Sequence, residues 1–99
     1  MTGSDYQRAA ARTLIDKPDH AFSDRDLMLM WCALGLAGEA GETVDAIKKA
    51  VCHQHGIDVV MLRKELGDVL WYVAGICTLL EVDIGDVMAG NIAKLRARY

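Results

Sequence analysis

Two pairs of acidic residues are the side chains in this sequence with the clearest capacity for chemistry. Glu39 and Glu42 form an E-x-x-E pair, and Glu65 and Asp68 form an E-x-x-D pair. Residues three apart on an α-helix project from the same face, so each pair makes an acidic patch if its segment is helical. At a separation of about 5 Å and an effective dielectric of about 20, two such charges repel by roughly 3 kcal/mol. Protons or a cation must relieve this repulsion, and hard oxygen ligands favour Mg²⁺ or Mn²⁺.

The residues around these acids differ from those of an ordinary solvated helix face. On the helical sector of the first pair, the neighbours are small where Lys or Arg is usual: Gly35, Thr43, Ala46 and Ala50. The sector of the second pair is largely apolar and holds Met61, Tyr72, Gly75, Ile76 and Leu79. Burying an unpaired charge in such surroundings is costly. We therefore interpret the four acids as metal ligands, shared between two antiparallel helices that a short turn connects.

The elements that must position these acids are helices, because no segment alternates with the period of a strand. A possible capping box at residues 4–7 predicts the start of a first helix, which Lys17-Pro18 should end. Ser23 predicts the start of a second helical region that runs to about Cys52. Three glycines fall inside this region and are expected to kink or split it. They are Gly35, Gly38 and Gly41.

The second half of the sequence predicts two further helices. Residues 53–56 read as a turn, and Asp58 is placed to cap a long helix through Leu80. That helix is apolar on nearly every side after Val69, so we expect it to be the central buried element. Asp83 is placed to cap a last helix over residues 84–98. The prediction is an all-α protein, a bundle of four to five helices.

The bulk properties set limits on the class of protein. Ninety-nine residues make a single domain, 1–99. The 53% of apolar residues exceeds what a small monomer easily hides, and we assign the excess to a subunit interface. With a net charge of −3 and no polybasic segment, neither nucleic acid nor a membrane surface is an expected partner.

The cysteines and the absence of targeting signals predict a cytoplasmic protein. The three cysteines are odd in number, widely spaced and set in apolar sequence, which indicates buried thiols in a reducing compartment: Cys32, Cys52 and Cys77. No signal peptide opens the sequence. Its longest apolar run, residues 69–80, is too short to span a bilayer.

Longer stretches around the acids carry a family resemblance. They are Leu36-Ala-Gly-Glu39-Ala-Gly-Glu42, Ile47-Lys48-Lys49, Lys64-Glu65-Leu66-Gly67-Asp68-Val69-Leu70-Trp71-Tyr72, and the ending Asn91-Ile-Ala-Lys94-Leu-Arg-Ala-Arg98-Tyr99. Together they resemble the MazG-like nucleotide pyrophosphohydrolases of the all-α NTP pyrophosphatase superfamily, over roughly residues 27–99. The resemblance implies Mg²⁺-dependent hydrolysis of a nucleoside triphosphate, such as a dNTP, to the monophosphate and pyrophosphate. It also implies a homodimer or homotetramer.

The resemblance also implies roles for particular residues. The four acids match the Mg²⁺-binding positions of the family, and either Glu39 or Glu42 is expected to take the proton of the attacking water. For substrate binding, Asn91 and Lys94 match family positions, and helical spacing adds four candidates. Those four are Lys49 and Arg98 for the phosphates, and Tyr72 and Trp31 for stacking on the base or sugar.

Two alternatives stay open. One is another activity of the superfamily, with phosphoribosyl-ATP, dUTP or dCTP as the substrate. The other is a catalytically silent, oligomerising helical module whose acids hold a structural cation or contact a basic partner. Zinc peptidase, P-loop and serine hydrolase motifs are missing from the sequence. His53 and His55 are interpreted as surface residues and His20 as structural.

Overall fold

The described part of the chain forms four helices, within the four to five that the sequence predicts. The computed structural model describes residues 1–14, 21–53 and 56–99, and these residues include no strand. The helices are α1 (Gly3–Ala11), α2 (Asp24–Cys52), α3 (Val59–Leu80) and α4 (Ile84–Arg98). The prediction of an all-α protein is confirmed. Within the described residues, no helix is both long and apolar enough to cross a membrane.

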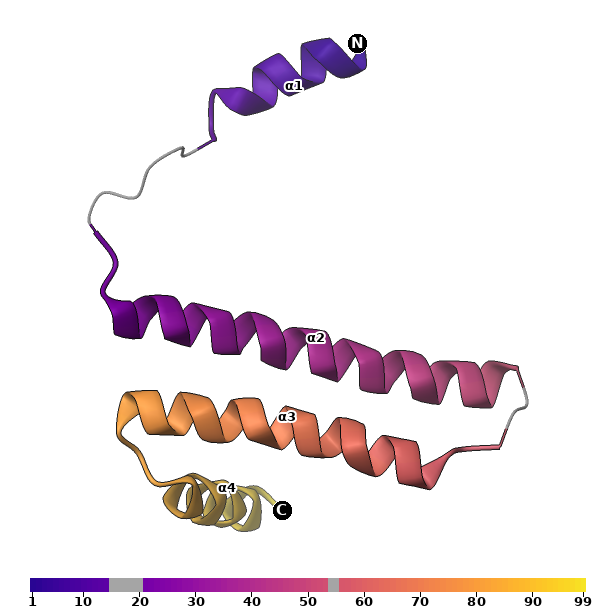
Figure 1. Ribbon diagram of the computed structural model, residues 1–99, viewed down its shortest axis with the longest axis vertical. Helices are drawn as coiled ribbons and strands as arrows, with labels where there is room; N and C mark the ends of the chain where they lie inside the picture. The colour runs from indigo at the N-terminus through magenta and orange to yellow at the C-terminus, as the bar shows by residue number, and fades with distance from the viewer. Residues whose placement is uncertain (15–20, 54–55) are drawn as a thin grey trace.

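An antiparallel pair of long helices, α2 and α3, is the centre of the fold (Figure 1). The other two helices make far fewer contacts: α1 lies apart from the pair and α4 crosses one end of it (Figure 1). Cys32 of α2 and Cys77 of α3 are the two buried residues of the described chain. The prediction that α3 is a central buried helix is therefore wrong for a single chain, because neither α1 nor α4 covers its outer surface.

The isolated chain is open and leaves much apolar surface in water. Its radius of gyration is 19.6 Å, whereas a compact domain of 100 residues has about 13 Å. Its accessible surface is 8460 Å², against about 5500 Å² for a compact protein of 10.8 kDa. Large apolar side chains of both central helices are exposed, among them Leu34 at 68% and Leu70 at 60%. One copy of the chain thus has almost no core of its own.

Side-chain caps set the starts of α2, α3 and α4, as predicted. Ser23 Oγ accepts the N–H of the third helical residue at 3.0 Å, and Asp58 Oδ1 accepts the equivalent N–H at 3.1 Å. Asp83 Oδ1 accepts two N–H groups, from Gly85 at 2.6 Å and from Asp86 at 3.2 Å. These bonds satisfy donors that a helix start otherwise leaves without partners. At the other end of α2, His53 is the C-cap, and the rest of the predicted turn includes residues 54–55, outside the described ranges.

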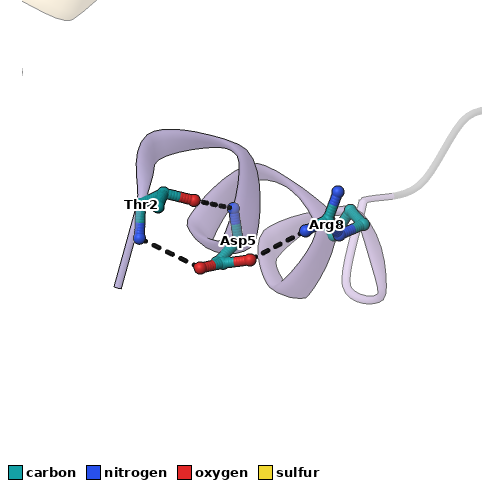
Figure 2. A network of polar contacts seen from close by, with 3 residues as sticks. All are labelled: Thr2, Asp5 and Arg8. Carbon is teal, nitrogen blue, oxygen red and sulfur yellow. Dashed lines mark hydrogen bonds and ion pairs between the residues drawn. The ribbon is translucent and has the colours of Figure 1, made fainter.

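The start of α1 differs from the prediction. Its capping box is made by Thr2 and Asp5, not by residues 4–7, and each accepts the other's backbone N–H (Figure 2). Asp5 suits this role better than Gln7 because its carboxylate also forms a 2.7 Å ion pair with Arg8, one turn further on. The helix ends at Ala11, so the predicted extension to Lys17-Pro18 is also wrong; those two residues lie outside the described ranges.

The three glycines do not split α2, which is one helix of 29 residues. The propensity cost of each glycine is at most about 1 kcal/mol, and packing along α3 is enough to offset it. One of them, Gly35, has a packing reason: a Cβ there would overlap the ring of Tyr72 on α3, with Cδ1 only 2.8 Å away. Gly38 and Gly41 have nothing within 4 Å of the equivalent point.

A left-handed residue makes the corner between α3 and α4. Glu81 has φ 58° and ψ 39°, the one positive φ among the described non-glycine residues. Its N–H donates to the carbonyl of Thr78 at 3.1 Å, and the N–H of Val82 donates to that of Cys77 at 3.0 Å. This pair of bonds is the Schellman motif that ends many helices.

The thiols divide into two environments. All three cysteines are free, but only Cys32 and Cys77 are buried, while Cys52 is exposed in the last turn of α2. The prediction of three buried thiols is wrong for Cys52, because α2 begins to lose its cover from α3 at that end.

We predict that Asp83→Ala lowers the free energy of unfolding by about 1 kcal/mol, because two N–H groups at the start of α4 lose their acceptor. Urea unfolding followed by circular dichroism measures this change. The control is Asp83→Asn, which retains an oxygen acceptor and should lose clearly less stability. Equal losses in the two variants would contradict a capping role.

Candidate metal centre

Three carboxylates meet across the interface of α2 and α3. Glu39 and Glu42 come from α2 and Glu65 from α3, and one oxygen of each lies within 4.8 Å of the others. Glu39 and Glu65 are half-buried, whereas Glu42 is exposed. The antiparallel arrangement brings them together because the turn between the helices is short, which places the second half of α2 beside the first half of α3.

The fourth acid, Asp68, lies one turn beyond Glu65 and is exposed. It is not part of the group of three, but its charge is close enough to raise the pKa of Glu39. The structure thus places all four acids in one electrostatic environment.

The surroundings of Glu39 raise its pKa. Partial burial is the largest cause, followed by repulsion from Glu42, a hydrogen bond with the Glu65 carboxyl group, and the charges of Asp68 and Glu65. Together these raise the pKa of Glu39 from 4.5 to about 7. Oε2 of Glu39 and Oε2 of Glu65 are buried and have no donor among the described residues. A proton on Glu39 would supply one, in agreement with the upward direction of its pKa shift.

The chemistry of these ligands fits a hard divalent cation. The cluster offers carboxylate oxygens alone, which suit Mg²⁺ and Mn²⁺ better than zinc. The 4.8 Å limit on their separation is close to the roughly 4 Å between opposite oxygens around Mg²⁺. A cation would interact favourably with the two buried oxygens that lack donors. It would also replace the proton on Glu39.

Beside the acids, three aromatic rings pack edge to face. Trp31 of α2 lies 5.8 Å from Tyr72 and 6.4 Å from Trp71, and the last two are 5.1 Å apart. Tyr72 is half-buried and lies one helical turn from Asp68. Sequence reasoning singled out Trp31 and Tyr72 and missed Trp71. The sequence did offer one signal for Trp71: it follows Asp68 by three residues and so lies on the flank of the helix face that carries Asp68.

An apolar hollow adjoins these rings, between the first half of α2 and the second half of α3. Its volume is about 380 Å³. Its lining includes Met28, Trp31 and Cys32 from α2, and Trp71, Gly75 and Leu79 from α3. Because Gly75 and Leu79 continue the helix face that carries Asp68 and Tyr72, the hollow and the acids lie along one side of the helix pair.

In a single chain, the side chains predicted to bind the phosphates lie away from the four acids. Lys49 forms an exposed ion pair with Asp45, with Nζ to Oδ2 at 2.9 Å, and lines a smaller hollow at the turn end of the pair. Asn91, Lys94 and Arg98 are exposed on α4, which packs little against the other helices. Among the described residues of one chain, no positive side chain forms an ion pair with the four acids.

This arrangement, an all-α protein with a carboxylate cluster on two central helices, agrees with the comparisons with known proteins. Residues 31–99 match the family model of the MazG nucleotide pyrophosphohydrolase domain. Gene 37 protein of Mycobacterium phage L5 is 37% identical over 97 residues, covering 94% of this chain and 84% of the phage protein. No solved structure matches the chain.

The chain therefore belongs to the MazG nucleotide pyrophosphohydrolase domain family, as the sequence motifs indicate. The matched region contains all four acids, the three aromatic rings and the whole of α4. Membership supports activity as a nucleotide pyrophosphohydrolase, and the carboxylate cluster agrees with the use of a divalent metal that is typical of this family.

The raised pKa of Glu39 predicts how the stability of the metal-free protein depends on pH. Folded Glu39 binds its proton up to about pH 7, whereas the unfolded chain loses it near 4.5. The contribution of this group to stability is therefore full below about pH 4.5 and is lost as the pH rises through 7.

We expect the melting temperature of the protein in EDTA to fall between pH 5.5 and pH 8 more steeply for the wild type than for Glu39→Gln, whose side chain does not titrate. Asp24→Asn, at an exposed acid in the first turn of α2, serves as the control and should follow the wild type. Parallel profiles for all three proteins would contradict the assigned pKa.

Proposed function

We propose that the protein hydrolyses nucleoside triphosphates, including deoxynucleoside triphosphates, to the monophosphate and pyrophosphate with the help of Mg²⁺ or Mn²⁺. The observation that carries this proposal is the meeting of Glu39, Glu42 and Glu65 across the helix pair, with two buried oxygens that lack donors. A structural role alone does not account for such a cluster, because its mutual repulsion destabilises the metal-free fold.

The four acids would hold the cation, whose positive charge would let the substrate approach. A triphosphate carries about four negative charges, so it cannot approach four carboxylates without positive charge between them. When bound, the metal would polarise the α-phosphate and activate water for in-line attack. Glu39 and Glu65 supply the half-buried ligands, and Glu42 and Asp68 supply exposed ones.

Proton removal from the attacking water is assigned to the α2 pair. Glu42 is the carboxylate in that pair that solvent reaches, and Glu39 is the half-buried one beside it. Whichever of the two has an oxygen within hydrogen-bond reach of the water would take its proton.

The remaining substrate contacts combine aromatic and positive groups. Trp31 and Tyr72 offer ring surfaces next to the acids for the base or sugar. Lys49 would exchange its partner Asp45 for a phosphate oxygen. The predicted phosphate ligands of α4 are Asn91, Lys94 and Arg98. Their exposure and the loose packing of α4 support a site completed by a second chain.

We also propose that the protein is a homodimer or homotetramer in which the apolar sides of the helix pair are covered. The surface of one chain exceeds that of a compact protein by roughly 2900 Å². A stable interface needs about 800 Å² from each partner. The exposed apolar residues of both central helices are therefore more than sufficient for one.

The activity is tested by pyrophosphate release from a panel of nucleotides. We predict release only with Mg²⁺ or Mn²⁺, and a loss of at least about 100-fold in kcat for Glu42→Gln, because a ligand and a candidate base disappear together. Asp24→Asn, which removes the same charge elsewhere on α2, should retain wild-type rates.

The same panel separates the alternatives. Including phosphoribosyl-ATP, dUTP and dCTP tests the other superfamily activities by their relative kcat/KM. If folded protein releases no pyrophosphate from any of these compounds, and Glu42→Gln changes assembly instead, the protein is the silent helical module.

The oligomer is tested by light scattering coupled to gel filtration. We predict a mass of two or four chains for the wild type, and a shift toward lower mass for Leu34→Glu and Leu70→Glu, because each places a charge in the covered surface. The control is Leu14→Glu, at an exposed apolar residue beyond α1. A wild-type monomer at micromolar concentration would overturn the proposal.

A further inference from the structure

Gly35 of α2 and Tyr72 of α3 are in close contact next to the acids. At Gly35, and not at Gly38 or Gly41 on the same helix, an added Cβ would overlap another side chain. The atoms it would meet are Cε1, Cζ and Cδ1 of Tyr72. The ring thus lies directly on the backbone of α2, one turn before Glu39.

Two indoles pack against the ring of Tyr72. Trp31 lies 5.8 Å from it on the α2 side, and Trp71 lies 5.1 Å away on its own helix. Both indoles line the apolar hollow of about 380 Å³, whereas Tyr72 is not part of its lining. A displacement of the Tyr72 ring toward either indole would therefore shift that indole.

We propose that Gly35 is a specificity-determining residue: its missing side chain lets the Tyr72 ring lie on α2, and this ring sets the positions of Trp31 and Trp71, which line the hollow that takes the nucleobase. The inference rests on the proposed function and adds to it a place for the base. Gly35 touches no substrate and acts through Tyr72, so it is a positioning residue.

The shape and chemistry of the hollow suit a nucleobase. It is apolar, has two indole faces for stacking, and adjoins the carboxylates that would hold the metal and the triphosphate. From Trp31 to Glu39 there are eight residues of helix, or about 12 Å, which is the scale of a nucleotide extended from base to phosphates. The positions of the two indoles, which touch edge to face, then decide how well a purine or a pyrimidine fits against them.

The test compares Gly35→Ala with Gly38→Ala, a matched change on the same helix with no contact to disturb. For each protein, kcat/KM is measured with one purine and one pyrimidine deoxynucleoside triphosphate. We expect Gly35→Ala to change the ratio of the two values by roughly tenfold, mainly through KM, and Gly38→Ala to change it by less than about twofold.

A double variant tests whether Gly35 acts through the ring. In a Tyr72→Leu background the obstructing ring is gone, so adding Gly35→Ala should leave the ratio within about twofold of that of Tyr72→Leu alone. Two further measurements do not depend on turnover. Mn²⁺ affinity should be unchanged in Gly35→Ala, since the acids stay in place, whereas tryptophan emission should shift in Gly35→Ala and not in Gly38→Ala.

The outcomes separate this inference from the proposal on which it rests. If the wild type hydrolyses nucleotides and Gly35→Ala keeps the wild-type ratio, the inference alone is overturned. An equal effect of Gly35→Ala with and without Tyr72 overturns it too, because the residue then does not act through the ring. If the wild type hydrolyses no nucleotide, both fail together.

Discussion

Repulsion among carboxylates at the contact between α2 and α3 is the constraint around which this structure is organised. The helices must pack closely enough to bring Glu39 and Glu65 together, yet every step closer raises the cost of their charges. Without metal, a proton on Glu39 relieves part of that cost. A divalent cation would relieve more of it and would couple the affinity of the site to the integrity of the helix pair.

The helix pair is poor in core because two helices alone cannot enclose one. Only two cysteines are buried in the described chain, and the acids take part of the contact between the helices. The large apolar side chains are left on the outer surfaces, where another chain must cover them if the fold is to be stable. In the proposed oligomer, the inner interface serves chemistry and the outer surfaces supply stability.

How far the sequence could predict this structure varied with the kind of signal. Ser23, Asp58 and Asp83 identified three helix starts because a cap is a local interaction between near neighbours. Thr2 and Asp5 were missed because Ser4 and Gln7 satisfy the same pattern two residues later. The convergence of Glu39, Glu42 and Glu65 was foreseeable from helical spacing and one short turn. The place of Trp71, the intact α2 and the exposure of α3 depend on packing, which no local pattern records.

The corner at Glu81 has a consequence for the geometry of the whole assembly. Glycine is the usual residue in a left-handed helix end, and it would leave this joint several backbone conformations. A glutamate adopts a positive φ only at an energetic cost, and it permits a much narrower range of backbone conformations. The joint between α3 and α4 is therefore stiff. The direction in which α4 leaves the pair is thereby fixed before any second chain arrives. A rigid elbow of this kind would let the last helix dock on its neighbour without first having to be ordered.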